Sequence, residues 1–319
     1  MRNMKKAGKK MKLTNKAEKK KKLKIRRYMP YYIMFIPVLA YYVIFRYIPL
    51  IYAFIISIIK YQPGKGIFNS KFVGFDYYLQ FIKSKFFLRL IRNTLAINFL
   101  QLTIGFVAPI ILALLLNEIG RKRYKKLVQT VTYLPNFISS VVVVSMIVTF
   151  LSPSTGLINN IREHLGMERI NFLTEPRYFW IIYTLMTIWQ TAGYTAIIYL
   201  AALTGINSEL YEAAKIDGAG RWKQLWYVTL PGISSTIVLM FLMKVGRVLD
   251  VGYDTIILMY NPSIYSTADV IGTYVYRRGI LNSEYSFGSA VGFFQSIIGL
   301  LLVILANKLS KKYTETSLW

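Results

Sequence analysis

The chain contains no cysteine, a single histidine and few acidic residues. Asp and Glu number 14 among its 319 residues, against 40 Lys and Arg, so the formal net charge is +26 at pH 7. The absence of cysteine excludes disulfides, iron–sulfur clusters and thiolate chemistry. The histidine, His164, falls in a polar loop, where we expect a surface residue.

The chain also lacks a nucleotide-binding motif. The phosphate-binding pattern Gly-x-x-x-x-Gly-Lys-Ser/Thr does not occur in it. Without that glycine-rich loop, the usual cradle for the phosphates of a nucleotide is missing. We therefore expect no catalytic residue, no metal site and no cofactor bound by this chain.

Long apolar runs are the dominant feature. Hydrophobic residues make up 55% of the chain, and they gather in runs of about 20 or more, each able to cross a hydrocarbon layer of about 30 Å. The predicted fold class is therefore an all-α integral membrane protein. Its six predicted membrane-spanning helices are residues 30–58, 88–117, 127–151, 178–205, 230–250 and 286–307.

The positive charge is concentrated beside these runs. Residues 1–27 hold fourteen Lys or Arg against one acid, and the basic run stops where the first apolar stretch begins. Such a run is typical of a cytoplasmic flank touching anionic lipid, and it indicates no nucleic-acid partner. The apolar stretch that follows is too long for a cleavable signal peptide. We expect a basic cytoplasmic tail at 1–28, a transmembrane domain at 29–308 and a second tail at 309–319.

Charges in the loops support this orientation, with one exception. The linker 118–126 carries five Lys or Arg and falls on the cytoplasmic side, as does the C-terminal tail. The first outer segment, 59–87, departs from the rule because it also carries five lysines against one aspartate. These lysines are Lys60, Lys65, Lys71, Lys83 and Lys85. Within this segment, residues 72–82 predict a short amphipathic helix at the membrane interface.

The inner loop 207–231 is the most informative segment. Asn207 or Ser208 can cap a helix, and Gly218 then breaks it. A second short helix is predicted from Arg221 to Val228, before Pro231 opens the fifth span. The first helix places Leu210, Ala213, Ala214 and Asp217 on one shallow face, which another protein can approach closely.

This loop resembles the EAA loop of binding-protein-dependent ABC importer permeases. That motif has Glu-Ala-Ala, then a glycine after three residues, then an aliphatic residue and Leu-Pro after nine more. The matching residues are Glu212, Ala213, Ala214, Gly218, Val228, Leu230 and Pro231. The continuation Lys-Ile-Asp-Gly-Ala resembles the carbohydrate-uptake, maltose-type branch, and weaker similarities extend over about residues 30–308.

The resemblance implies the role of the loop and the partners of the chain. It would be the coupling helix that inserts into a cleft on a separate ATPase, with Glu212, Ala213, Ala214, Asp217 and Gly218 as the coupling residues. Two cytoplasmic ATPase subunits would use ATP and Mg²⁺. A second related permease would form a heterodimer with this chain, and an extracellular substrate-binding lipoprotein would deliver the cargo. The expected location is the plasma membrane of a Gram-positive bacterium, with both termini in the cytoplasm.

Polar residues within the spans suggest a path for the cargo. In the fourth span, Tyr183, Thr187, Gln190 and Tyr194 follow helical spacing beside Trp189, and the second span adds Asn98 and Gln101. These residues either line a sugar pathway or join helices to one another. In the fifth span, Lys244 and Arg247 either pair locally with Asp250 or face an aqueous cavity. In the second case they would favour acidic sugars.

Two other functional classes stay open at this point. A permease for a non-sugar solute would use the same coupling principle. A gradient-driven secondary transporter would ordinarily show inverted repeats or intramembrane ion-pair relays, and the sequence shows no internal repeat and few deep carboxylates.

Overall fold

The computed structural model describes residues 28–314 and 316–318. The predicted basic tail lies outside the described residues except for Tyr28. The chain divides into two compact units, residues 1–56 and residues 57–319, which we call unit 1 and unit 2. Each unit is described by itself.

Unit 1 contributes the first span. A single helix covers Tyr28–Ser57, and none of residues 28–56 is buried within the chain. Pro49 lies within this helix and does not end it. A π-helical turn, η1 (Val43–Tyr47), precedes α2 (Ile48–Ser57), and the Ile48 amide donates to Val43 O. The wider turn shifts the hydrogen-bond register just ahead of the proline, which has no amide hydrogen to donate.

Unit 2 begins with a hairpin and four helices. The two-residue strands β1 (Ile59–Lys60) and β2 (Lys71–Phe72) pair antiparallel. Phe72, expected to start the interfacial helix, therefore lies in a strand, and Gly74, at φ +61°, separates it from the helix. The helices that follow are α3 (Asp76–Ile82), α4 (Phe87–Glu118), α5 (Lys122–Tyr133) and, after the 3₁₀ turn η2 (Leu134–Phe137), α6 (Ser140–Phe150).

The second half of unit 2 carries the fourth, fifth and sixth spans. The short helix α7 (Leu157–His164) precedes α8 (Pro176–Thr204), and α9 (Ser208–Ile216) follows it. The fifth span consists of α10 (Arg221–Gln224), η3 (Leu225–Thr229), α11 (Leu230–Gly232) and α12 (Ser234–Val245). The outer segment that follows is α13 (Tyr253–Met259), η4 (Pro262–Ile264), α14 (Tyr265–Ala268), α15 (Ile271–Val275) and η5 (Tyr276–Leu281), and the last span is α16 (Tyr285–Thr314).

The predicted all-α membrane fold is confirmed, although two spans are bent. Among the described residues, four helices are long and apolar enough to cross a membrane, and there are six spans if each bent pair counts as one. The third span turns by 101° between Phe137 and Ser140, and the fifth turns by 59° at Ile233. Both bends lie just after a proline, Pro135 in η2 and Pro231 in α11, where a backbone hydrogen bond is lost.

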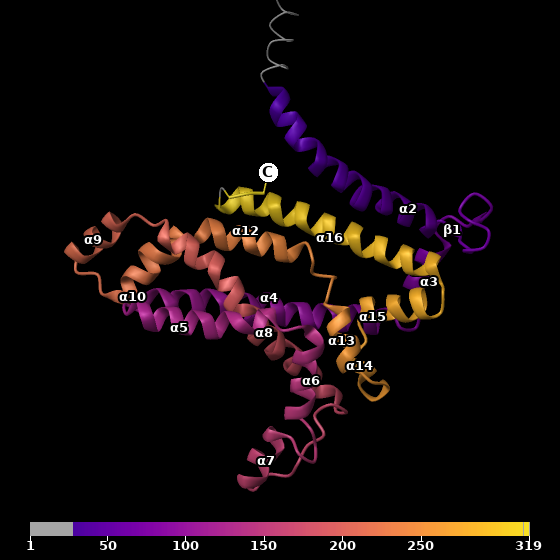
Figure 1. Ribbon diagram of the computed structural model, residues 1–319. Helices are drawn as coiled ribbons and strands as arrows, with labels where there is room; N and C mark the ends of the chain where they lie inside the picture. The colour runs from indigo at the N-terminus through magenta and orange to yellow at the C-terminus, as the bar shows by residue number, and fades with distance from the viewer. Residues whose placement is uncertain (1–27, 315, 319) are drawn as a thin grey trace, which may run out of the picture. The chain divides into compact units, whose positions relative to one another are not determined.

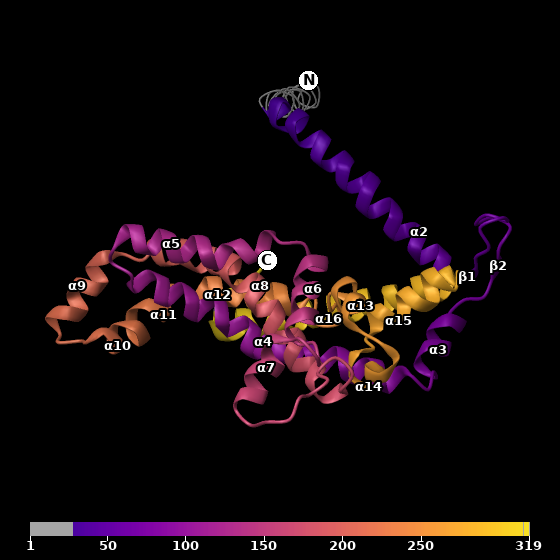
Figure 2. The same cartoon turned by 60° about the horizontal axis from the view of Figure 1, so that its bottom comes forward.

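Close packing of α4 on α8 organises unit 2. Tyr199 of α8 is buried against Ala113 and Leu116 of α4 in one apolar cluster that also includes Ile233. Gly193 marks the closest approach of α8 to α5, because a Cβ there would lie 1.9 Å from Thr132 O. Figures 1 and 2 both show α9 and α10 at one end of unit 2, and α3 with the β1–β2 hairpin at the other.

Candidate coupling surface and transport pathway

The α9 helix is capped as its sequence predicts. Asn207 Oδ1 accepts a hydrogen bond from the Glu209 amide at 3.0 Å, and Asn207 Nδ2 donates to Glu209 Oε2 at 3.0 Å. The cap satisfies one of the free amides at the helix start, and the Glu209 carboxylate lies in the first turn, where the helix dipole favours a negative charge. The Asn207 side chain therefore fixes the start of α9.

A left-handed glycine ends the same helix. Gly218 adopts φ +72°, and its amide donates to Lys215 O at 3.0 Å. The Ala219 amide reaches back to Ala214 O at 2.8 Å, which closes the last turn in the pattern common at helix C-termini. No heavy atom outside the local chain lies within 4 Å of a Cβ built on Gly218, so only the backbone angle requires glycine here.

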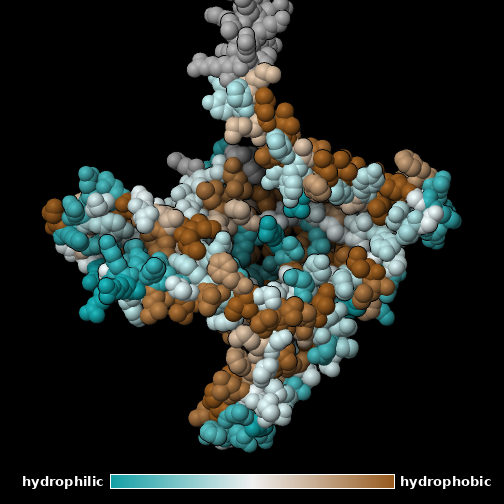
Figure 3. Space-filling model, in the orientation of Figure 1, coloured by the Kyte–Doolittle hydropathy of each residue, from teal (hydrophilic) through white to brown (hydrophobic). Residues whose placement is uncertain are grey.

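The α9–α10 hairpin leaves most of its predicted coupling residues exposed. No residue of α9 is buried in the structure, and Glu212, Ala213, Asp217 and Gly218 are all exposed. Neither Glu212 nor Asp217 forms an ion pair within the described residues. Figure 3 shows hydrophilic residues gathered over this end of the molecule. Its open face is suited to contact with another protein.

Internal hydrogen bonds hold the hairpin to the fifth span. The hydroxyl groups of Tyr211, in α9, and Thr229, in η3, lie 3.0 Å apart. Gln224 Nε2 donates to Ala219 O at 2.7 Å, which closes the turn between α9 and α10. These hydrogen bonds join α9 and α10 to the start of the fifth span.

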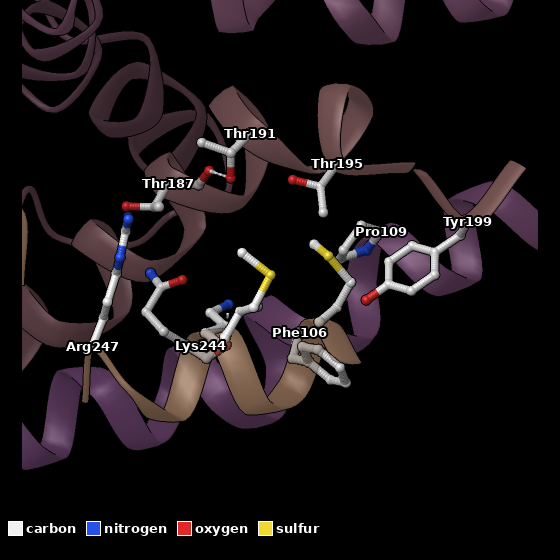
Figure 4. A pocket seen from close by; sticks show the side chains of 12 residues that line it. Phe106, Pro109, Thr187, Thr191, Thr195, Tyr199, Lys244 and Arg247 are labelled. Carbon is white, nitrogen blue, oxygen red and sulfur yellow. Dashed lines mark hydrogen bonds between the residues drawn. The ribbon is translucent and has the colours of Figure 1, made fainter. Parts of the chain in front are cut away.

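A cavity of about 340 Å³ lies between α4, α8 and the end of α12. Figure 4 shows Lys244, Arg247 and the threonines of α8 turned toward it. The lining residues come from three spans: Gln101, Gly105, Phe106, Pro109, Thr187, Thr191, Thr195, Tyr199, Met240, Met243, Lys244 and Arg247. We call this cavity the central pocket.

Two cations and no carboxylate line the central pocket. Lys244 Nζ donates to Gln101 O at 2.7 Å and lies 6.0 Å from the centre of the Phe106 ring. Arg247 reaches toward Thr187 in Figure 4. Within the described residues neither cation forms an ion pair, and Arg247 does not bridge to Asp250. The pocket therefore carries positive charge that these residues do not neutralise.

Neutral polar groups complete the lining. Thr187 and Thr191 donate their hydroxyl hydrogens to the carbonyl oxygens four residues earlier, both at 2.8 Å, which leaves their oxygens free to accept. Buried Gln101 Nε2 has no hydrogen-bond partner in the described part of the chain. Such unpaired donors and acceptors are costly unless water or a hydroxyl-rich ligand satisfies them.

The predicted pathway residues separate into two groups. Gln101, Thr187, Lys244 and Arg247 meet in the central pocket. The other five do not line it. Tyr183 is buried and stacked on Phe179, Tyr194 packs against Phe137, and Trp189 is exposed. Gln190 Nε2 donates to Ile138 O at 3.1 Å, and Asn98 Nδ2 donates to Thr94 O at 3.0 Å.

Sequence reasoning missed three residues of α8 that line the pocket. Thr191, Thr195 and Tyr199 continue from Thr187 at intervals of four. This spacing keeps residues on one helical face over a few turns. Extending the pattern from Thr187 by four residues at a time would have found them.

Residues 105–314 match the family model described as "Binding-protein-dependent transport system inner membrane component". The chain belongs to this family. The family inferred from the inner loop is confirmed, and the chain is a multi-pass membrane subunit of a transport system and not itself an enzyme.

Several relatives match over nearly the whole chain. The polygalacturonan/rhamnogalacturonan transport system permease protein YteP of Bacillus subtilis (strain 168) is 41% identical over 308 residues, 95% of each chain. Protein LplB of the same organism is 41% identical over 288 residues, 90% of each chain. A crystal structure of a bacterial alginate ABC transporter, in complex with an alginate pentasaccharide-bound periplasmic protein, contains a chain with 41% identity and a TM-score of 0.84. That match covers 92% of this chain and 98% of the other.

Proposed function

We propose that this chain is a permease subunit of an ATP-driven importer for an acidic oligosaccharide. The observation that carries the proposal is the central pocket, where Lys244 and Arg247 lie among hydroxyl and amide groups with no lining carboxylate. Cations within a membrane protein are costly, and an anionic cargo offsets that cost while it passes.

The relatives support the same class of cargo. The name of YteP states that it transports polygalacturonan and rhamnogalacturonan, and the structural neighbour described above is an alginate transporter. Polygalacturonan and alginate are both polymers of sugar acids. A carboxylate on each repeating unit would meet Lys244 and Arg247 in turn, and the threonine hydroxyls of α8 would accept hydrogen bonds from sugar hydroxyls.

The other parts of the importer follow from the family. A second related permease would complete the pathway, two ATPase subunits would hydrolyse ATP with Mg²⁺, and an external binding lipoprotein would deliver the cargo. In this assembly Glu212, Ala213, Ala214, Asp217 and Gly218 contact the ATPase, so the loop 207–231 faces the cytoplasm. We place both termini on the same side of the membrane, in a Gram-positive cell. The exposure of the α9–α10 hairpin supports this contact.

A charge-selectivity assay tests the cargo. The complete importer is reconstituted in vesicles, and ATP-dependent uptake of an oligogalacturonide is compared with uptake of its carboxyl-reduced, neutral form. Lys244→Met and Arg247→Gln should each lower uptake of the acidic form about tenfold, since a hydrogen bond to a charged group is worth roughly 1.5–3 kcal/mol. Uptake of the neutral form should change little.

Lys308→Met is the matched control, because Lys308 is exposed on α16 and does not line the pocket. Equal losses for both oligosaccharides in the pocket variants would exclude charge recognition by Lys244 and Arg247. Competition by a peptide or an amino acid, without competition by any sugar, would favour the alternative of a non-sugar permease.

A coupling assay tests the role of α9. Glu212→Ala should abolish most ATP-dependent uptake while the subunits still co-purify, since Glu212 is exposed and supports no internal contact that the structure describes. Glu209→Ala, an acidic residue on the same helix, is the control and should retain most uptake. Uptake driven by a proton or sodium gradient without ATP would overturn the assignment as an ABC permease.

A further inference from the structure

A second cluster of cations lies in the β1–β2 hairpin, and none of its residues lines the central pocket. The β1–β2 hairpin places Lys60 directly opposite Lys71 in its register, and Lys65 lies in the connecting loop. Together they line a cavity of about 240 Å³, whose other lining residues are Gln62, Asn69 and Ser70. This cavity accounts for three of the five lysines by which the segment 59–87 departs from the usual charge distribution.

The lysines of this cavity have no acidic partner within the described residues. None of them forms an ion pair there, and no Asp or Glu lines the cavity. Like charges directly opposite one another in a strand pair destabilise the pairing. An arrangement with this internal cost is relieved when an anion occupies the space between the ammonium groups.

The hairpin holds the cavity in a defined shape. Gly66 adopts φ +69°, and Ser70 Oγ donates to Gly66 O at 2.6 Å across the loop. The Tyr61 amide donates to Ser286 Oγ at 2.9 Å, which ties the hairpin to the start of α16. The lysines therefore project from a fixed loop.

The loop between the two strands also carries an aromatic side chain, Phe68. Phe68 is fully exposed, at 101% of its reference area. A large apolar side chain entirely in water is a typical anchor for a protein partner, because covering it removes its whole surface from water. Lys65 and Lys71 lie three residues before and three residues after Phe68 in the chain, and cations near such an anchor resemble the polar rim of a protein–protein interface.

The position of the hairpin restricts its partner. Figures 1 and 2 show β1 and β2 at the end of unit 2 opposite to α9 and α10. If α9 contacts the cytoplasmic ATPase, as the proposed function requires, the hairpin faces the outside. The family depends on an external binding protein, which must dock on that side.

We propose that the β1–β2 hairpin is a docking element for the external binding protein. Phe68 inserts into an apolar hollow of that protein, and Lys60, Lys65 and Lys71 pair with an acidic patch around the hollow. The cargo itself is a poorer fit, because no aromatic ring lines the cavity for a sugar to stack on. A lipid headgroup is also a poorer fit, since binding to a charged membrane surface needs no shaped cavity. The inference rests on the proposed function for its orientation.

Direct binding tests the proposal without requiring transport. The complete importer is placed in nanodiscs of zwitterionic lipid, and binding of the purified binding protein from the same transport system is measured. Lys60→Gln with Lys71→Gln should weaken binding about tenfold or more at low salt, mainly through slower association, and should flatten the salt dependence. Phe68→Ala should weaken binding mainly through faster dissociation.

A second pair of lysines provides the matched control. Lys83→Gln with Lys85→Gln removes the same charge from the same outer segment, but neither residue lines the cavity. This variant should bind as the wild type does. Equal weakening by both double variants would overturn the proposal, because the overall positive charge of the outer segment would then explain the effect.

Other outcomes would also overturn the docking role. Unchanged binding in the hairpin variants would exclude it, and so would an effect that is present only with anionic lipid, which would indicate a membrane contact. Weakened uptake with normal binding would assign the hairpin to the cargo. Failure of the proposed function is a separate result, since it would be seen as wild-type uptake that does not need ATP, whatever the binding assay shows.

Discussion

Two regions of unit 2 use their acidic side chains in opposite ways. At the α9–α10 end, Glu212 and Asp217 are exposed and form no ion pair among the described residues. Between α14 and α15, the Asp269 carboxylate is completely buried, with one guanidinium nitrogen of Arg89 and one of Arg277 each 2.9 Å from Asp269 Oδ2. The α9–α10 hairpin leaves its carboxylates available, and the Asp269 region uses its carboxylate internally.

The buried carboxylate joins several elements. Thr273 Oγ1 donates to Asp269 Oδ1 at 2.9 Å, and Asn93 Nδ2 of α4 donates to Asp269 O at 2.9 Å. Burial alone would lower the pKa of Arg277, but its hydrogen bonds to Asp269 and to Tyr260 outweigh this and raise it, so the guanidinium stays charged. The segment α14 to η5 is thus fixed to α4. The chain can satisfy its charges where rigidity is needed, so the open charges of α9 indicate a surface for a partner.

The largest expected loss of stability follows from removing the buried carboxylate. Asp269→Asn leaves Arg89 and Arg277 without their counter-charge, and breaking a buried ion pair typically costs about 3 kcal/mol or more. The thermal unfolding midpoint of the purified permease complex should fall clearly. Asp254→Asn is the control, because Asp254 is exposed on α13, and it should leave the midpoint unchanged. Equal midpoints for the two variants would remove the contrast between the two regions.

A smaller loss is expected at the contact between α5 and α8. Gly193→Ala places a methyl group 1.9 Å from Thr132 O, so α5 and α8 must separate. Overpacking of this kind costs about 1–3 kcal/mol. Gly292→Ala is the control, because no atom outside the local helix lies within 4 Å of its Cβ. Thermal unfolding of the two variants in detergent would measure the difference, and similar midpoints would contradict the close contact.

Local patterns in the sequence predicted the spans and the inner hairpin. Apolar runs determine which segments cross the membrane, and α9 begins after Asn207 and ends before Gly218, as its capping residues indicate. These features depend on residues near one another in the chain. For this reason the structure agrees with the sequence most closely in α9 and in the long spans.

Features that depend on distant residues were not predictable in the same way. The mean hydropathy of a window of residues locates a span but does not give the direction of its helix axis. The 101° bend of the third span was therefore not predicted. The spacing of polar residues in α8 does not show which of its faces meets the central pocket, because Gln190 and Tyr194 also follow helical spacing but contact Ile138 and Phe137. Arg89 and Asp269 are 180 residues apart, and only the fold brings them together.

A substitution in the turn of the α9–α10 hairpin should lower uptake and leave stability nearly unchanged, whereas Asp269→Asn should lower stability. Gly218→Ala forces an L-residue into the left-handed region, at a cost of about 1–2 kcal/mol, but the loss is confined to an exposed turn. ATP-dependent uptake should fall while the unfolding midpoint of the complex hardly changes. Gly220→Ala, two residues on, has a negative φ and open space around it, so it should retain uptake. A fall in the midpoint with normal uptake would reverse the assignment of the two regions.

The smallest effect is expected at the cap of α9. Asn207→Ala removes the side chain that accepts from the Glu209 amide, and loss of such a cap costs about 1 kcal/mol. Because α9 is exposed, this cost should appear as faster amide hydrogen exchange in its first turn and not as a change in the unfolding midpoint. Asn207→Ser keeps an acceptor oxygen without placing a second carboxylate beside Glu209, and it should restore slow exchange. If amide exchange accelerated equally in α14 and α15, the stability of α9 would be coupled to the stability of those helices. The first turn of α9 would then not open independently.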